Sequence, residues 1–216
     1  MRKCVVQDLG LLGYGPALDM QHRIAAERKQ GLGTDHLLFV EHPHVVTMGR
    51  NGHEENLLAP KETLLRSGIE LHETDRGGDV TYHGPGQVVG YPIMDLREWK
   101  RDVGAFVRAI EQVVIDTLEE FSIRAQRIPK LTGVWVGEAK IAAIGVHLSR
   151  WVSTHGWALN VTTDLKYFQY IVPCGLAKPV TSMELLGARV DGAEVKRGLA
   201  RHFGRIFDFE IVGELI

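Results

Sequence analysis

Two side chains in this sequence are candidates for nucleophilic chemistry, Cys174 and Lys140. Cys174 lies between a proline and a glycine in the sequence IVPCGL, on backbone expected to turn tightly instead of continuing a helix or strand. A cysteine attacks as its thiolate, and an ordinary thiol pKa of about 8.5 leaves only a few per cent ionised at neutral pH. A catalytic Cys174 therefore needs a base or a cation nearby. The alternative is a free cysteine that serves as a small core residue.

The partner that would ionise this thiol is either a histidine, the common choice, or a lysine. His83, His147 and His155 are the histidine candidates, and Lys140 introduces the apolar segment AKIAAIG. If Lys140 points inward, burial lowers the pKa of its amine, which can then accept the thiol proton. If Lys140 stays charged, it stabilises the thiolate electrostatically. A solvated lysine at a turn is the third possibility.

A glycine-rich segment, DRGGDVTYHGPGQVVGYP at residues 75–92, places five glycines and two prolines within eighteen residues. Glycine adopts positive φ and has no Cβ, so the main-chain N–H groups of such a segment can approach a ligand closely. Pro85 stiffens the turn between two of the glycines. The pattern predicts backbone shaped against a ligand. A long, well-ordered hairpin turn without a ligand is the alternative.

Composition is that of a soluble protein with a substantial core. The chain has 216 residues, 44% of them hydrophobic and 24% charged, and its formal net charge is −2. We therefore expect no strong field for nucleic acid or for a membrane surface. No apolar run approaches the roughly 18–20 residues that span a bilayer, and the N-terminus lacks the apolar core of a secretory signal. A cytoplasmic protein with a single domain over residues 1–216 is expected.

Metal and cofactor sites are not expected. The two cysteines, Cys4 and Cys174, are 170 positions apart and are expected to be free thiols in a cytoplasmic protein. Neither belongs to a zinc-type spacing, and the HPH triplet at residues 42–44 lacks a clustered acidic or thiolate partner.

The order of the predicted elements indicates an α+β fold. Apolar periodicity predicts helices at residues 16–30, 61–67, 103–120 and 193–207. Strands are predicted at residues 36–41, 45–49, 70–74 and 88–94, and an antiparallel meander at 133–137, 140–149 and 153–161. Because the strands cluster instead of alternating regularly with helices, we expect a mixed, largely antiparallel sheet with packed helices.

Three blocks of sequence, in order, closely resemble the lipoyl(octanoyl) transferases. They are residues 75–92, the block GEAKIAAIGVHLSRWVSTHGWALNV at 137–161, and VPCGL at 172–176 followed by Thr181 and Ser182. The resemblance extends from the first predicted helix to about Leu186. It implies the α+β fold that this family shares with the catalytic domains of biotin and lipoate protein ligases.

The resemblance also implies an activity. Family members move an octanoyl group from acyl carrier protein to a lysine of a lipoyl domain, without ATP or a cofactor. The acceptors implied are the lipoyl domains of 2-oxoacid dehydrogenase complexes and the glycine cleavage H protein. By resemblance, Cys174 is the acyl-accepting nucleophile, Lys140 activates it, and the protein is a monomer. The residues implied to bind substrate are Arg76, Gly77, Gly78, Asp79, Val80, Thr81, Tyr82, His83, Ala143, Ile144, Gly145, Gly156, Trp157 and Ala158.

Three other functions remain open at this point. A lipoate or biotin protein ligase would need ATP and no cysteine nucleophile. A non-catalytic acyl-binding or carrier-binding protein would not need Cys174 and Lys140. A papain-like hydrolase would need a histidine partner for its cysteine.

Acidic carrier proteins would have to be attracted locally by a chain of nearly neutral net charge. We expect part of a set of basic residues to border the site, although a solvated charged face would have the same composition. The set is Arg124, Arg127, Lys130, Lys166 and Lys178.

Overall fold

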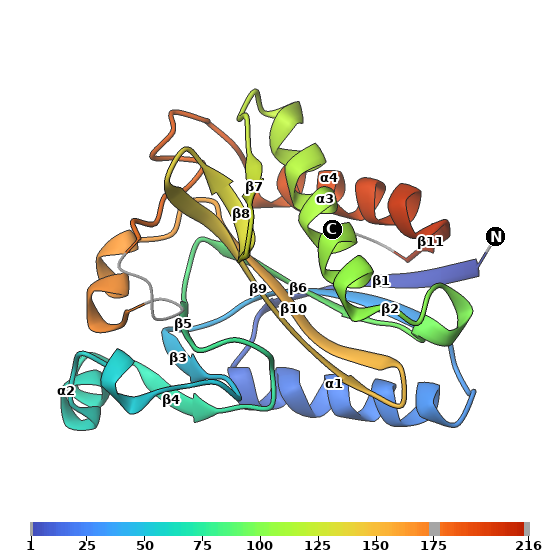
Figure 1. Ribbon diagram of the computed structural model, residues 1–216, viewed down its shortest axis with the longest axis horizontal. Coiled ribbons are helices and arrows are strands. Elements are labelled where there is room, and N and C mark those ends of the chain that lie inside the picture. The colour runs from blue at the N-terminus through green and yellow to red at the C-terminus, as the bar shows by residue number, and fades with distance from the viewer. Residues whose placement is uncertain (1, 173–177, 214–216) are drawn as a thin grey trace.

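The computed structural model describes residues 2–172 and 178–213, which form two sheets and four α-helices (Figure 1). The larger sheet has the strand order β11-β1-β2-β6-β10-β9-β8-β7, and the smaller one has the order β4-β3-β5. The strands are β1 (Arg2–Leu11), β2 (Asp35–Glu41), β3 (Val45–Met48), β4 (Glu70–Glu73), β5 (Val80–His83), β6 (Gln87–Ile93), β7 (Gln126–Ile128), β8 (Leu131–Val136), β9 (Ala139–Ser149), β10 (Val152–Asn160) and β11 (Phe209–Val212). The helices are α1 (Tyr14–Lys29), α2 (Lys61–Arg66), α3 (Val103–Glu120) and α4 (Gly192–Phe207).

The larger sheet is mixed and mostly antiparallel, which confirms the predicted fold class. Neighbouring strands from β2 through β6, β10, β9 and β8 to β7 run antiparallel, whereas β1 runs parallel to both β2 and β11. The predicted meander is the β8–β9–β10 unit. Local sequence pattern did not predict the strands β1, β5, β7 and β11.

Helices cover both faces of this sheet, as Figure 1 shows: α3 and α4 lie on one side, and α1 lies on the other with the smaller sheet. Strand β2 shows why two covers are needed. Leu37 and Phe39 join the cluster under α3 and α4, whereas Leu38 and Val40 join the cluster under α1. Successive side chains of a strand point to opposite faces, so a strand apolar at every position must be buried on both.

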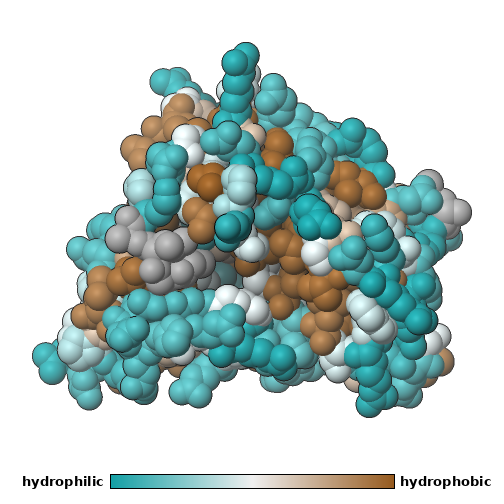
Figure 2. Space-filling model, viewed as in Figure 1, coloured by the Kyte–Doolittle hydropathy of each residue, from teal (hydrophilic) through white to brown (hydrophobic). Residues whose placement is uncertain are grey.

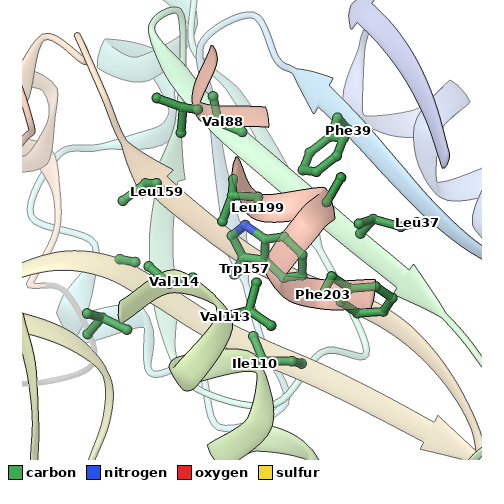
Figure 3. Close-up of a cluster of buried hydrophobic side chains, with 14 of the residues drawn as sticks. Leu37, Phe39, Val88, Ile110, Val113, Val114, Trp157, Leu159, Leu199 and Phe203 are labelled. Atoms are coloured by element: carbon green, nitrogen blue, oxygen red, sulfur yellow. The ribbon is translucent and has the colours of Figure 1, made fainter. Parts of the chain in front are cut away.

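The cluster between the sheet and the helices α3 and α4 is the larger core, and Figure 3 shows part of it. Trp157 of β10 lies in its centre, near Val113 of α3 and Phe203 of α4. The helix α3 begins after Asp102, whose carboxylate accepts the N–H of Ala105 at 2.8 Å. This cap satisfies a backbone donor that the first turn of a helix leaves unpaired.

The smaller sheet has a core of its own with α2. Val46, Leu64 and Tyr82 are buried in this core, and Ile171 joins them from a distant part of the chain. Ile171 follows the 3₁₀ helix Leu165–Tyr170 and forms an isolated bridge with Leu57. Ile171 is thereby fixed against the smaller sheet, next to residue 172, which is the last residue of the first described range.

The contact between β6 and β10 leaves no room for a side chain at Gly90. Gly90 lies opposite Trp157, and a Cβ on Gly90 would be 2.2 Å from an indole carbon of Trp157. Gly90→Ala should therefore lower the free energy of unfolding by about 1–3 kcal/mol through overpacking, measured by urea denaturation.

A matched control for this substitution is Gly15→Ala in α1. A Cβ at Gly15 would have no neighbouring atom within 4 Å. Because alanine favours a helix over glycine by up to about 1 kcal/mol, this variant should be at least as stable as the parent protein. Equal stability of the Gly90→Ala variant and the parent would contradict the packing described here.

Candidate functional site

The strands β9 and β10 form a pair whose face towards α1 carries very little side-chain bulk. Ala143 lies opposite Ala158, and Gly145 lies opposite Gly156. These four positions share one face of the pair, because side chains alternate along a strand. The ring of the intervening Trp157 points to the other face, into the cluster of Figure 3. The result is a shallow strip of backbone and methyl groups along the pair.

Residues 75–79 of the glycine-rich segment, here called the glycine-rich loop, lie across this strip. The N–H of Gly77 donates to the carbonyl of Val146 in β9 at 2.9 Å. A Cβ on Gly145 would be 2.6 Å from the Gly77 oxygen, so only glycine at position 145 permits this approach. On the opposite side of the loop, a Cβ on Gly49 would be 2.3 Å from one of the loop's carbonyl oxygens. The loop is therefore held between two backbone surfaces.

Arg76 shapes the loop from within. Its side chain is buried, with the residue 7% exposed. Its Nη2 donates to the carbonyl of Thr47 at 2.5 Å, its Nε to the Thr47 hydroxyl at 3.1 Å, and its Nη1 to the carbonyl of Gly77 at 3.1 Å. Much of the hydrogen-bonding capacity of this guanidinium is thus used to fix the loop to β3.

A narrow cavity with mostly apolar walls lies between the strip and the loop. Ten of the fourteen residues predicted to bind substrate line it: Arg76, Gly78, Thr81, His83, Ala143, Ile144, Gly145, Gly156, Trp157 and Ala158. Four lining residues were not in that set: Tyr14, Val89, Tyr91 and His155. Because side chains alternate along a strand, the strand predicted at residues 88–94 could have placed Val89 and Tyr91 on one face. Nothing in the sequence brings Tyr14, 141 positions away, next to His155.

The four other predicted residues lie around the cavity without lining it. Strand β5 directs Thr81 and His83 towards the cavity, whereas Val80 and Tyr82 point the other way, into the core of the smaller sheet. The Asp79 carboxylate accepts a hydrogen bond from the Asn56 amide at 2.5 Å. Gly77 faces Val146, as described above.

A wider groove of about 520 Å³ opens beside the narrow cavity and shares Gly78 and Ile144 with it. Figure 2 shows one face of the molecule, on which an exposed area of hydrophobic residues lies between hydrophilic residues. Lys140 lines the groove, and it also lines a small cavity. The small cavity shares three lining residues with the narrow cavity, Thr81, Ala143 and Ala158. Lys140 therefore borders the groove and the small cavity, and the small cavity adjoins the narrow cavity.

Lys140 is buried, 7% exposed, which excludes the solvated lysine considered from the sequence. Its Nζ lies over the Trp135 ring, 4.8 Å from the ring centroid. Gly133, at φ +127°, makes room for the lysine stem, because a Cβ there would be 3.3 Å from the Lys140 Cε. The Lys140 N–H donates to the carbonyl of Pro179, and its carbonyl accepts the N–H of Thr181, both at 2.9 Å.

Cys174 lies outside the described residues, within the segment 173–177. The chain on both sides of that segment bonds to residues that line the groove. The N–H of Val172 donates to the carbonyl of Asn56, a groove residue, at 2.8 Å. On the other side, Pro179 and Thr181 bond to the backbone of Lys140. The predicted roles of Cys174 and Lys140 remain predictions.

Two of the three candidate histidines line the narrow cavity, and neither lines the groove. Burial lowers the pKa of His83 to about 3, and its Nδ1 lies 2.8 Å from the Gln87 side-chain oxygen. Burial also lowers the pKa of His155, although its hydrogen bond to Asp75 at 2.7 Å opposes that effect. His83 is therefore neutral and a poor proton acceptor at neutral pH.

A chain of buried side-chain hydrogen bonds connects His83 to the segment beside Lys140. The side-chain oxygen of Gln87 bonds to His83. The side-chain nitrogen of Gln87 donates to the side-chain oxygen of Asn160 at 2.9 Å. The Asn160 amide then donates to the carbonyl of Thr181 at 3.0 Å. This chain links the end of β10 to the residues that pair with Lys140.

The sequence model of the lipoyl protein ligase A/B catalytic domain matches residues 14–204. The chain belongs to this family. It is 67% identical to an octanoyltransferase of Solibacter usitatus over 212 residues, which is 98% of this chain and 96% of the relative. The predicted resemblance is thereby confirmed.

Solved structures of the same architecture support the fold alone, because their sequences are distant. A lipoate protein ligase from T. acidophilum with bound lipoic acid has a TM-score of 0.76 at 17% identity, over 99% of this chain and 89% of that one. The biotin protein ligase from Aquifex aeolicus in complex with biotin and ATP has a TM-score of 0.57 at 14% identity, over 96% and 71%. The predicted similarity to both ligase domains is confirmed.

The expected basic border of the site is partly neutralised. Arg127 bonds to the Glu111 carboxylate at 2.9 Å, Lys166 pairs with Asp164 at 2.6 Å, and Lys178 pairs with Glu138. Lys130 is exposed and lines the groove. The electrostatic attraction of carriers therefore remains a prediction, with Lys130 as its best-placed member.

Neither a membrane crossing nor a metal cluster is found among residues 2–172 and 178–213. The helices there are too short or too polar to cross a bilayer. The His, Cys, Asp and Glu side chains of these residues form no group of three or more that could hold a metal ion.

Because buried neutral histidines lie behind the narrow cavity, the stability of the protein is expected to fall at acid pH. His42 is fully buried between the carbonyl of Leu12 and the Tyr91 hydroxyl, each 2.7 Å away, and burial lowers its pKa from 6.5 to about 4. Between pH 6.5 and about 4, unfolded His42 binds a proton that folded His42 does not. The free energy of unfolding should therefore fall as the pH is lowered through this window.

Urea denaturation at several pH values measures this slope, and His42→Asn should make it shallower whatever the variant's absolute stability. The exposed His22→Gln is the control. An identical slope in the parent and the His42→Asn variant would show that the stability does not depend on a neutral His42.

Proposed function

We propose that this protein is an octanoyltransferase that moves an octanoyl group from acyl carrier protein to a lysine of lipoyl domains, through a thioester on Cys174. The observation that carries the proposal is the position of buried Lys140 at an open groove and at the small cavity that adjoins the narrow apolar cavity. The chain on both sides of the Cys174 segment bonds to residues that line this groove. The octanoyltransferase of Solibacter usitatus supports it.

The proposed reaction has two balanced steps. In the first, Lys140 accepts the Cys174 thiol proton, the thiolate attacks the donor thioester, and the proton passes to the departing phosphopantetheine thiol. In the second, the acceptor lysine attacks the enzyme thioester, and its proton passes through Lys140 to the Cys174 sulfur. Exchange between thioesters is nearly balanced and amide formation is downhill, so ATP is not needed.

In this proposal the narrow cavity and the groove bind different parts of the substrates. The narrow cavity takes the acyl chain, where each buried methylene contributes about 0.8 kcal/mol. The groove admits the phosphopantetheine arm and then the acceptor lysine. The donors for the developing oxyanion must be sought outside Gly77, because its N–H is bonded to Val146. The acceptors proposed are the lipoyl domains of 2-oxoacid dehydrogenase complexes and the glycine cleavage H protein, and the enzyme is proposed to be cytoplasmic and monomeric.

An adenylating ligase of the same fold is the second candidate, favoured by the solved structures of lipoate and biotin ligases. It would need ATP and would make no use of a cysteine. The presence of Cys174, between Pro173 and Gly175 in the sequence, favours the transferase. The papain-like hydrolase is disfavoured because the buried His83 is a poor base.

An acyl-enzyme on Cys174 is the sharpest test of the proposal. When the protein is mixed with octanoyl-acyl carrier protein in the absence of ATP, intact-mass measurement should show the gain of one octanoyl group. Cys174→Ala should abolish that gain, and Cys4→Ala should retain it. Transfer to a lipoyl domain at the parent rate by the Cys174→Ala variant would refute the thioester mechanism.

The role of Lys140 predicts a pH-dependent defect. Lys140→Met should slow acyl-enzyme formation by about 10²–10⁴-fold at neutral pH, the usual contribution of a positioned base. The defect should shrink above about pH 8.5, where the thiol ionises by itself. Rapid-quench mass spectrometry at several pH values measures the rate. Lys166→Met, an exposed lysine paired with Asp164, is the control and should be unaffected. A Lys140→Met defect that is the same at every pH would exclude the proposed proton transfer.

A further inference from the structure

The narrow cavity has two distinguishable ends. At one end it shares Gly78 and Ile144 with the groove, and Thr81, Ala143 and Ala158 with the small cavity beside Lys140. Val89 lies opposite Ala158, at this same end. Three lining residues that border neither of those spaces, Tyr14, Tyr91 and His155, form what is here called the deep end. An acyl chain attached near Lys140 would therefore point its methyl terminus towards the deep end.

The deep end is closed. Its three residues come from α1, β6 and β10, and each is at most 3% exposed. Two of the three are held by hydrogen bonds behind the wall. The Tyr91 hydroxyl lies 2.7 Å from the Nε2 of His42. The ring Nε2 of His155 lies 2.7 Å from the Asp75 carboxylate. The backbone N–H of His155 donates to the side-chain oxygen of Gln21 at 2.7 Å. These partners prevent the wall from moving aside at low cost.

Tyr14 is the part of this wall that comes from a helix and not from the sheet. It is the first residue of α1, and its ring packs against the rings of His42 and His72, with centroids 5.4 and 5.2 Å apart. Its hydroxyl lies 3.5 Å from the Nδ1 of His155, so the ring spans from the helix to β10. An acyl chain longer than the cavity would have to displace the Tyr14 ring. Otherwise the chain would bury its terminal methyl group against the Tyr14 hydroxyl and the Nδ1 of His155.

We propose that Tyr14 is the residue that limits acyl-chain length, by closing the deep end of the narrow cavity opposite Lys140. This inference rests on the proposed octanoyl transfer and adds the residue that sets its specificity. In this arrangement octanoyl fills the cavity, and longer chains are rejected by the Tyr14 ring instead of by a lack of apolar contact.

The test compares chain lengths within each variant. Parent protein, Tyr14→Leu and Tyr14→Phe are supplied with octanoyl- and decanoyl-acyl carrier protein, and kcat/KM for transfer to a lipoyl domain is measured. Tyr14→Leu should raise the decanoyl-to-octanoyl ratio by about fifteenfold, the value of burying two methylenes. Tyr14→Phe keeps the ring and should change the ratio by less than about threefold. An unchanged ratio in Tyr14→Leu overturns the proposal.

Because the ratio compares two donors on the same sample, a smaller folded fraction does not alter it. Failure of the parent protein to transfer octanoyl at all would instead refute the proposed function.

Discussion

The site depends on one close contact between two pieces of backbone, where the glycine-rich loop lies on β9. The carbonyl of Gly77 occupies the space that a side chain on Gly145 would fill, and the Gly77 N–H bonds to the next carbonyl of β9, that of Val146. Without this contact the loop would stand further from the sheet, and Arg76, anchored to β3, could not close over the strip. The floor and roof of the narrow cavity are therefore set together, by the absence of side chains.

Much of the architecture follows from local sequence pattern. The stripe of apolar residues in α3 and the long β-rich runs of β9 and β10 were predicted within a few residues, because their periodicity reports burial directly. The parallel pairing of β1 with β11 joins segments about 200 positions apart, and neither segment signals the other. The glycine-rich segment was only partly predicted: residues 75–79 form a loop over the cavity, whereas Val80–His83 and Gln87–Ile93 form strands of two different sheets.

The chemistry of the site was less accessible from sequence than its fold. The burial of Lys140 was anticipated only as a possibility, because it depends on Gly133 in the neighbouring strand and on the ring of Trp135, at a bulge that local pattern does not reveal. Tyr14 and His155 meet only after α1 folds onto β10. Fold does not choose between transferase and ligase either, since the same layers serve both. That choice rests on particular side chains.

In the proposed transfer, the groove at Lys140 also has a consequence for the control of the reaction. If a loaded carrier must withdraw before a lipoyl domain can enter, carrier that has already lost its acyl group competes with the acceptor for the same space. Turnover would then follow the ratio of charged to discharged carrier, and not the amount of either alone. Discharged carrier would thereby act as an inhibitor at the site itself.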